Sequence, residues 1–493
     1  MINVNRVVVE YTDNHERVFW IREKKISNKH KGRVYPTQVS DITTPRSVAV
    51  YYIDELGERK QIAQLACVDY RLLKQKYEDG DFINLNYTYI DDFSWYGTNR
   101  FYEIDESQFR KLKGFSAYCS FWNGENLGDK LVNLMQLNIT NEDVCFDYSI
   151  FNRMVFCLTN VNIHKGSLYF DNARFLSADV SLMGISCNKN LYDNPTISMN
   201  NTEFKNSSVE LFQLKDHINI NFLSSEMTNT KVEINNTRGS IGTVCLTKAK
   251  LDKFFISHCK IGGIDSRNSD INILSLMGCE LNGLSEIELA SNYELSFSAC
   301  LLNSILKLDI HQNSKSIRFD STINNGRIYF KSFSRIMNSV LNGVKETDDI
   351  NQLLMLKENF RSLGEYEHED LCYSKYRKME NELHEKNIFN KCKNYLTLLI
   401  SDYGTKPFRL FMFILGLIFG FSLLYYVCPI IMFQHATTFI DYVYVSGITF
   451  FTVGYGDILP LNSISKIVVL FEAFLGVTTM SYFLVVLSRK IIR

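Results

Sequence analysis

The stretch FTVGYGDILP, residues 451–460, places two glycines around a tyrosine and follows them with an aspartate. It lies between two strongly apolar segments, residues 410–433 and 467–487. An extended backbone with every carbonyl turned to one side needs residues that tolerate φ > 0, because an ordinary strand alternates its carbonyls. Gly454 and Gly456 meet that need. The stretch therefore predicts a loop that lines a path with backbone oxygens, which can replace the water around a cation.

Both flanking segments are long enough to cross a bilayer. Residues 410–433 contain no Asp, Glu, Lys, Arg or His, and as a helix they reach about 36 Å across a hydrocarbon layer of about 30 Å. Residues 467–487, interrupted only by Glu472, reach about 31 Å. A buried helix of a globular domain is the alternative for either segment, but the length favours a membrane span.

Basic residues flank the two segments unequally. Those outside are Lys391, Lys393, Lys406, Arg409, Arg489, Lys490 and Arg493, and only Lys466 lies between the segments. The excess of positive charge on the cytoplasmic side of membrane proteins then puts both termini in the cytoplasm. We expect an integral protein of a plasma membrane or bacterial inner membrane with two transmembrane helices.

The connecting segment HATTFIDYVYVSGITFFTVGYGDILPLNSIS, residues 435–465, is too short and too polar for a third crossing and predicts a re-entrant loop. Thr438, followed three residues later by Asp441, predicts a capped helix start. The apolar residues after it extend a short helix to near Phe451. Four such helices around one axis would point their negative C-terminal ends at a cation in the membrane.

The stretch TFFTVGYGD, residues 449–457, between this short helix and the second span, closely resembles the signature of two-transmembrane pore-loop potassium channels. The resemblance covers about residues 405–493. It implies a potassium-selective homotetramer in which K⁺ is the permeant ion and no cofactor is bound. The filter residues that it implies are Thr452, Val453, Gly454, Tyr455 and Gly456, with the Thr452 hydroxyl as a further ligand.

The resemblance also implies roles around the filter. Asp457 marks the outer mouth, and Tyr444, Thr449 and Glu472 support the filter. The ring of Tyr455 is expected to pack away from the axis, beside Tyr444. Some relatives pair the aspartate with a carboxylate of the pore helix, but Ile448 stands at that position here, so the partner of Asp457 stays open.

Two residues of the second span have alternative interpretations. Gly476 is either a gating hinge or a site of close helix packing. Glu472 is a costly intramembrane carboxylate. We expect it to form a structural hydrogen bond to the backbone behind the filter, the alternative being a direct ion site.

No arginine-rich sensor helix precedes the first span, and the chain ends at SRKIIR, soon after the second. Regulation is therefore expected from the N-terminal side or from a separate small-molecule or protein regulator.

Apolar residues recur every five positions between residues 131 and 335, a period that fits neither a helix nor a strand. Three such registers begin at Phe146, Phe170 and Ile241, and FDNARFLSADV (170–180) and LTKAKLDKFF (246–255) resemble pentapeptide-repeat proteins. The resemblance implies a right-handed quadrilateral β-helix of about ten coils with twenty residues in each. At about 4.8 Å between strands it would be some 50 Å long. Cys259, Cys279 and Cys300 are expected to be small core residues.

Charge and composition exclude several other functions. The repeat region carries 20 acidic and 19 basic residues, and the whole chain has a formal net charge of −1, so neither DNA mimicry nor nucleic-acid binding is expected. Twelve cysteines without zinc-like spacing predict reduced thiols.

Two further segments complete the chain. Residues 348–386 change to a helical period on both sides of Gly364 and predict a helical hairpin. In residues 394–409, we expect Leu396, Leu399, Ile400 and Tyr403 on one helix side along the inner membrane surface. The first 110 residues predict a small α+β or β-rich domain with strands in RVVVEY (6–11), RVFWIRE (17–23), SVAVYYIDE (47–55) and FINLNYTYI (82–90), and a helix at 62–78.

The predicted domains are residues 1–110, the β-helix 111–340, the helical linker 341–406 and the pore domain 407–493. The predicted function is a potassium channel gated through its N-terminal cytoplasmic domains. The alternative is a membrane-anchored interaction scaffold with little or non-selective conduction. An enzyme is not expected, because no nucleophile and base pair or metal cluster is evident.

Overall fold

The computed structural model describes residues 6–12, 29–30, 33–34, 40–53, 59–91, 110–125, 131–140, 143–187, 195–215, 217–236, 239–291, 294–310, 316–331, 333–341, 350–383 and 387–492. The expected strand at 17–23 lies outside these residues. The chain divides into two compact units, Met1–Lys345 and Glu346–Arg493.

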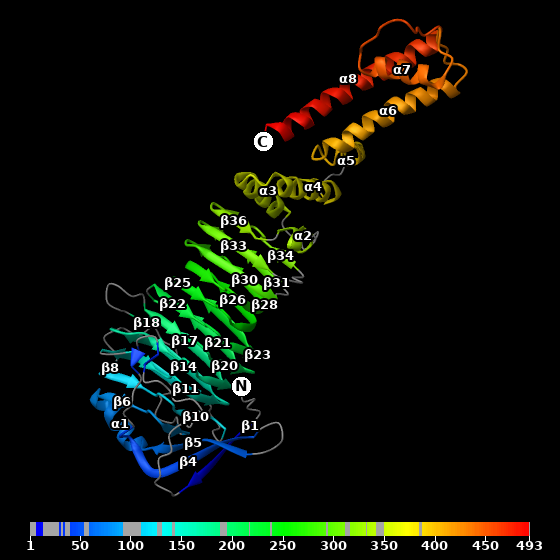
Figure 1. Cartoon of the computed structure of the whole chain (residues 1–493). Helices are drawn as coiled ribbons and strands as arrows, with labels where there is room; N and C mark the ends of the chain where they lie inside the picture. The colour runs from blue at the N-terminus through cyan, green and yellow to red at the C-terminus, as the bar shows by residue number, and fades with distance from the viewer. Residues whose placement is uncertain are drawn as a thin grey trace. The chain divides into compact units, whose positions relative to one another are not determined.

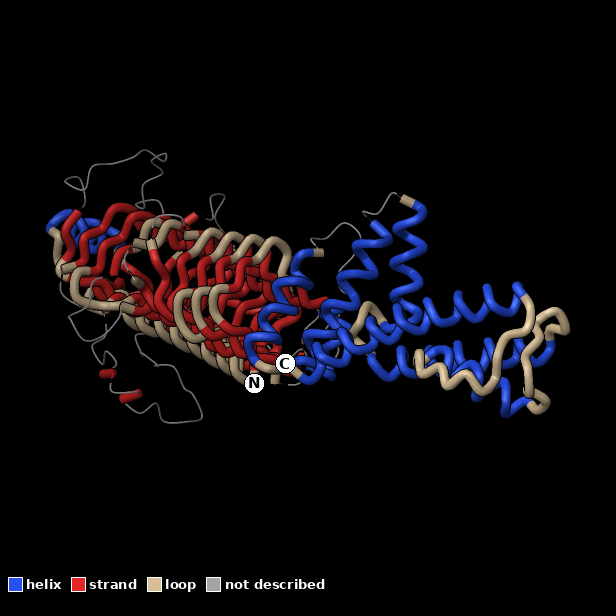
Figure 2. Tube along the Cα trace, turned by 90° about the horizontal axis from the view of Figure 1, so that it is seen from above, coloured by secondary structure: helices blue, strands red, loops and turns tan. Residues whose placement is uncertain are grey.

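The first unit is a β-solenoid of about ten turns. Its strands run from β6 (Phe82–Asn84) and β7 (Thr88–Ile90) to β36 (Arg327–Phe330), and each pairs in parallel with a strand of the next turn. Figures 1 and 2 show these strands stacked along one axis. Parallel pairing already begins at Ala66, which pairs with Thr88, whereas the boundary at residue 110 stays a prediction.

Apolar side chains inside each turn hold the solenoid together. All three five-residue registers are buried, from Phe146, Phe170 and Ile241 onward. Phe151, Phe175 and Phe204 stack in successive turns, with ring centroids 4.6 Å apart at both steps. Burying one such ring stabilises the fold by roughly 1.5–3 kcal/mol. The repeat prediction is thereby confirmed, and the cysteines 259, 279 and 300 are core residues.

The expectation that every turn contains twenty residues is wrong. Lys250 pairs with Asp270, twenty residues on, but Leu168 pairs with Ile197, twenty-nine residues on. The longer turn holds its extra residues between β18 (Ser186–Cys187) and β19 (Thr196–Ser198). Only the inward side chains must keep their register for the core to stay filled, so turns of unequal length are tolerated.

An antiparallel sheet precedes the parallel ladder. β4 (Thr43–Ile53) pairs with β1 (Arg6–Thr12) and with β5 (Arg59–Val68), so the strands expected at 6–11 and 47–55 are confirmed within the described residues.

The helix expected at 62–78 begins later than predicted. β5 occupies its first part, and only α1 (Tyr70–Asp79) is helical. The pairing of Leu65 with Val48 satisfies the backbone as a strand, and the Asp69 side chain then accepts the Arg71 and Leu72 N–H groups as a cap. A tertiary pairing thus overrides the local helical preference.

The remaining helices are α2 (Phe333–Leu341) in the first unit and, in the second, α3 (Asn351–Leu363), α4 (Tyr366–Leu383), α5 (Ile388–Ser401), α6 (Pro407–Val427), α7 (Phe439–Phe450) and α8 (Ser463–Ile491). α3 and α4 form the predicted hairpin, with Gly364 in the left-handed conformation at the break. α6 and α8 pack side by side, and α7 packs against both (Figure 1).

α6 and α8 are long and apolar enough to cross a membrane. Of their most apolar windows, 28% and 11% are buried inside the chain. A buried helix of a globular core would bury most of its surface, so that alternative is not supported.

Candidate pore and its surroundings

α7 begins with the predicted cap. The Thr438 N–H donates to the Asp441 carboxylate at 2.7 Å, and the Asp441 N–H donates to the Thr438 hydroxyl at 3.4 Å. These bonds satisfy two donors that a helix start leaves unpaired. They set where the helix begins, and it is twelve residues long and ends at Phe450.

The chain after α7 alternates its backbone conformation. Thr452, Gly454 and Gly456 have φ of 54°, 57° and 76°, whereas Val453 and Tyr455 between them are not left-handed. Left-handed φ was expected of the two glycines, but nothing in the sequence singled out Thr452, where it costs roughly 1–2 kcal/mol. The loop is tied to α7 where it starts, since the Val453 N–H donates to the Ile448 carbonyl at 2.8 Å.

The open question of the Asp457 partner has an answer. The Tyr444 hydroxyl, on α7, donates to the Asp457 carboxylate at 2.8 Å and so joins the helix to the far end of the loop. Tyr455 is largely exposed, at 73% of its surface, and half of Val453 is exposed as well.

Glu472 is completely buried on α8 and contacts side chains of the other two helices. The Tyr425 hydroxyl of α6 donates to one carboxyl oxygen, and the Ser446 hydroxyl of α7 lies against the other. Ser446 also reaches the Ile418 carbonyl at 2.9 Å. The expected hydrogen bond to the backbone is therefore replaced by one to each of two side chains, because Glu472 lies where all three helices meet.

Gly476 lies against the C-terminal end of α7. A Cβ atom built at this position would lie 2.3 Å from the Phe450 carbonyl oxygen, far inside contact distance. This close approach supports the packing alternative. α8 continues without a break through Gly476, and the hinge stays a prediction.

The end of α8 is bound to the α3–α4 hairpin. Asp370 of α4 forms ion pairs with Arg489 at 3.3 Å and Lys490 at 3.2 Å. Ser374, also on α4, donates to Asp402 in the turn between α5 and α6 at 2.5 Å. Sequence reasoning missed these contacts, since Asp370 and Arg489 are 119 positions apart.

α5 presents an exposed apolar stripe that includes Leu396 and Leu399, as expected for a helix along a membrane surface. Tyr403 departs from that expectation. It lies in the turn after α5 and is buried, with the Arg377 guanidinium 5.9 Å from its ring centre. The helix ends at Ser401, whose hydroxyl is 2.6 Å from the Tyr482 hydroxyl of α8.

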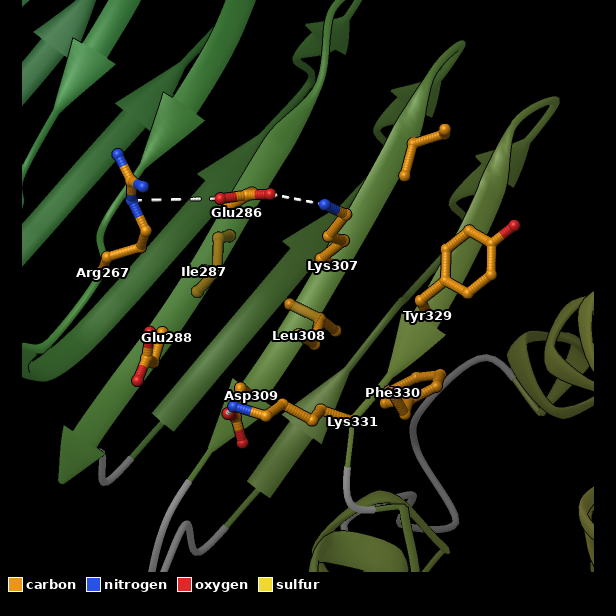
Figure 3. A pocket seen from close by; sticks show the side chains of 11 residues that line it. Arg267, Glu286, Ile287, Glu288, Lys307, Leu308, Asp309, Tyr329, Phe330 and Lys331 are labelled. Atoms are coloured by element: carbon orange, nitrogen blue, oxygen red, sulfur yellow. Dashed lines mark hydrogen bonds and ion pairs between the residues drawn. The ribbon is translucent and has the colours of Figure 1, made fainter.

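The solenoid carries a separate hollow of about 610 Å³ on the outer face of its last turns (Figure 3). Glu286 lies between Arg267 and Lys307, and Lys331 pairs with Asp309 at 2.6 Å. Because these charges neutralise one another, they indicate no particular ligand.

No metal site emerges among the residues that the structure describes. Their His, Cys, Asp and Glu side chains form no group of three or more that could hold a metal ion. Burial raises the pKa of the Cys372 thiol to about 12, so this cysteine stays protonated and unreactive.

Residues 411–493 match a family model described as an ion channel. The match includes most of α6, all of α7 and α8, and the FTVGYGD loop. No curated protein and no solved structure matches the chain. The C-terminal region is therefore a two-transmembrane channel domain of an integral membrane protein, preceded by a β-solenoid consistent with pentapeptide repeats. The family is one of ion channels and not of enzymes.

Proposed function

We propose that the protein is a potassium-selective channel in which the carbonyls of residues 452–455 and the Thr452 hydroxyl replace the water around K⁺. The observation that carries this proposal is the left-handed φ at every second residue from Thr452 to Gly456. Alternate residues of opposite handedness turn successive carbonyls to the same side, which an ordinary strand does not do. Such a row of oxygens is the basis of potassium filters.

Four chains assemble around the ion. One loop offers oxygens on one side only, and a dehydrated cation must be surrounded. The exposed side chains of Val453 and Tyr455 and the exposed surface of α8 are apolar areas that neighbouring chains and lipid would cover.

The surrounding contacts hold the filter in shape. Tyr444 anchors Asp457 at the outer end, Thr449 accepts the Thr452 N–H through its carbonyl at 3.0 Å, and Glu472 joins α7 to α6 and α8. The filter is thereby fixed to α7, which Glu472 in turn joins to α6 and α8.

Gating reaches the pore through the hairpin. α4 contacts both the end of α8 and the turn before α6, so a movement of the hairpin changes the restraint on both spanning helices. The N-terminal domains precede the hairpin in the chain and supply the signal.

The test is ion flux into liposomes containing the purified full-length protein. We expect K⁺ flux well above Na⁺ flux, and loss of K⁺ flux in Gly454→Ala, because a Cβ at φ = 57° is strained by roughly 1–2 kcal/mol in each of four chains.

Gly420→Ala is the matched control. Gly420 lies in α6 with open space at its Cβ position and no left-handed φ, so flux should be kept. A membrane-anchored scaffold, the alternative function, would give no selective flux in any variant, and that result would refute the channel.

A further inference from the structure

A hollow of about 710 Å³ lies between the α3–α4 hairpin and the C-terminal end of α8. Lys357 and Arg361 line it from α3, Glu369 and Tyr373 from α4, and Arg489 from α8. Three cations thus meet one carboxylate in a space large enough for a small ligand.

Two of the cations share one aromatic ring. The Lys357 ammonium lies 5.5 Å from the centre of the Tyr373 ring, and the Arg489 guanidinium lies 5.2 Å from it. The ring holds both like charges near the hollow, and an anion between them would relieve their repulsion.

Flanking carboxylates only partly neutralise the three cations that line the hollow. Glu358 contacts Lys357 at 2.8 Å, but its side chain is 59% exposed, and exposed ion pairs are weak. Asp370 is shared between Arg489 and Lys490. With these flanking groups included, four cations face three carboxylates, so one positive charge remains in excess.

The residue types and their position indicate phosphate chemistry. Guanidinium groups bind phosphate through paired hydrogen bonds, and lysine binds it as a point charge. Basic hollows at the end of a membrane-spanning helix lie at the depth of lipid head groups. Arg361 has a largely exposed side chain, with Glu358 as its ion-pair neighbour at 4.0 Å, and is available to turn toward such a ligand.

We propose that this hollow binds a phosphate-bearing anion through Lys357, Arg361 and Arg489. The bound anion ties the hairpin to the end of α8 and so regulates the pore. The phosphate belongs either to a lipid head group or to a soluble molecule. The regulatory effect rests on the proposed channel function, whereas binding does not.

The test measures the unfolding temperature of the full-length protein in detergent. The lipid probe is short-chain phosphatidic acid, with short-chain phosphatidylcholine as its control, and the soluble probe is inorganic pyrophosphate. We expect a concentration-dependent rise with a phosphate probe, and an apparent affinity at least about tenfold weaker in Arg361→Gln, which loses a charge-assisted contact.

Lys378→Gln is the matched control, because it removes one exposed positive charge from the same hairpin outside the hollow. Stabilisation by phosphatidic acid alone identifies a lipid, and stabilisation by pyrophosphate identifies a soluble ligand. No stabilisation by either probe, or equal weakening in both variants, overturns the proposal. Binding without any K⁺ flux would instead keep the site and remove the channel function.

Discussion

Glu472 shows how one buried residue can join three helices. Its carboxyl oxygens contact Tyr425 and Ser446, and no water is needed to satisfy them. A neutral amide side chain of the same shape can serve equally. Its oxygen accepts from the Tyr425 hydroxyl, and its NH₂ group donates to the Ser446 hydroxyl, which in turn donates to the Ile418 carbonyl. The contact therefore depends on shape and hydrogen bonding more than on charge.

We predict that Glu472→Gln keeps most of the stability and K⁺ flux of the protein, since an amide both accepts and donates. Glu472→Ala should leave two buried hydroxyls without this partner, at about 1–3 kcal/mol each. Thermal unfolding in detergent measures the difference. Loss of flux in the glutamine variant with unchanged stability would favour the direct ion site instead.

Gly476 offers a second test at a single residue, which distinguishes close helix packing from a gating hinge. Gly476→Ala places a Cβ against the Phe450 carbonyl, so we expect α8 to move away from α7 and the unfolding temperature to fall, by the equivalent of about 1–3 kcal/mol. Gly416→Ala, at an open position of α6, is the control. A variant with unchanged stability and altered opening would support the hinge.

Among the elements, α4 has the contacts that a gating connection needs. It reaches α8 through Asp370 and the turn before α6 through Ser374. It also packs on α3.

Asp370→Asn should weaken both ion pairs to α8 and change the K⁺ flux rate without changing the preference for K⁺ over Na⁺. The pairs are largely shielded at Asp370, so we expect an effect of about 1–3 kcal/mol on the balance between open and closed states. Single-channel recording in bilayers gives open probability and selectivity together. Glu367→Gln, an exposed site on the same helix, should behave as the unchanged protein.

Elements also differ in how far the sequence predicted them. The solenoid turns were predictable because a five-residue period is local and is repeated many times. The membrane spans were predictable because the length of an apolar segment is also a local property of the sequence. The late start of α1 was not, since residues 62–68 become a strand only through pairing with β4. The unequal turn lengths were missed because inserted residues carry no periodic signal.

The whole molecule joins a solenoid unit to a channel unit. Each unit is compact, so we expect the residue 452–456 loop to fold without the solenoid. Under the proposed function, we expect regulation and selectivity to belong to separable parts of the chain.

Removal of residues 1–345 should therefore alter the open probability but leave the K⁺ over Na⁺ ratio unchanged. Flux measured in both cations on the shortened and complete proteins tests this. A changed ratio would contradict the modular organisation.

The sequence alone determined the two spanning segments, the short capped helix, the glycine loop and the five-residue core pattern. All of these follow from local backbone preference or from burial that repeats at a regular spacing. Only the tertiary structure decided the partners of Glu472 and Asp457, the close contact at Gly476 and the basic hollow beside α8. These depend on which faces of separate helices meet, and the geometry of helix packing, not residue order, sets those distances.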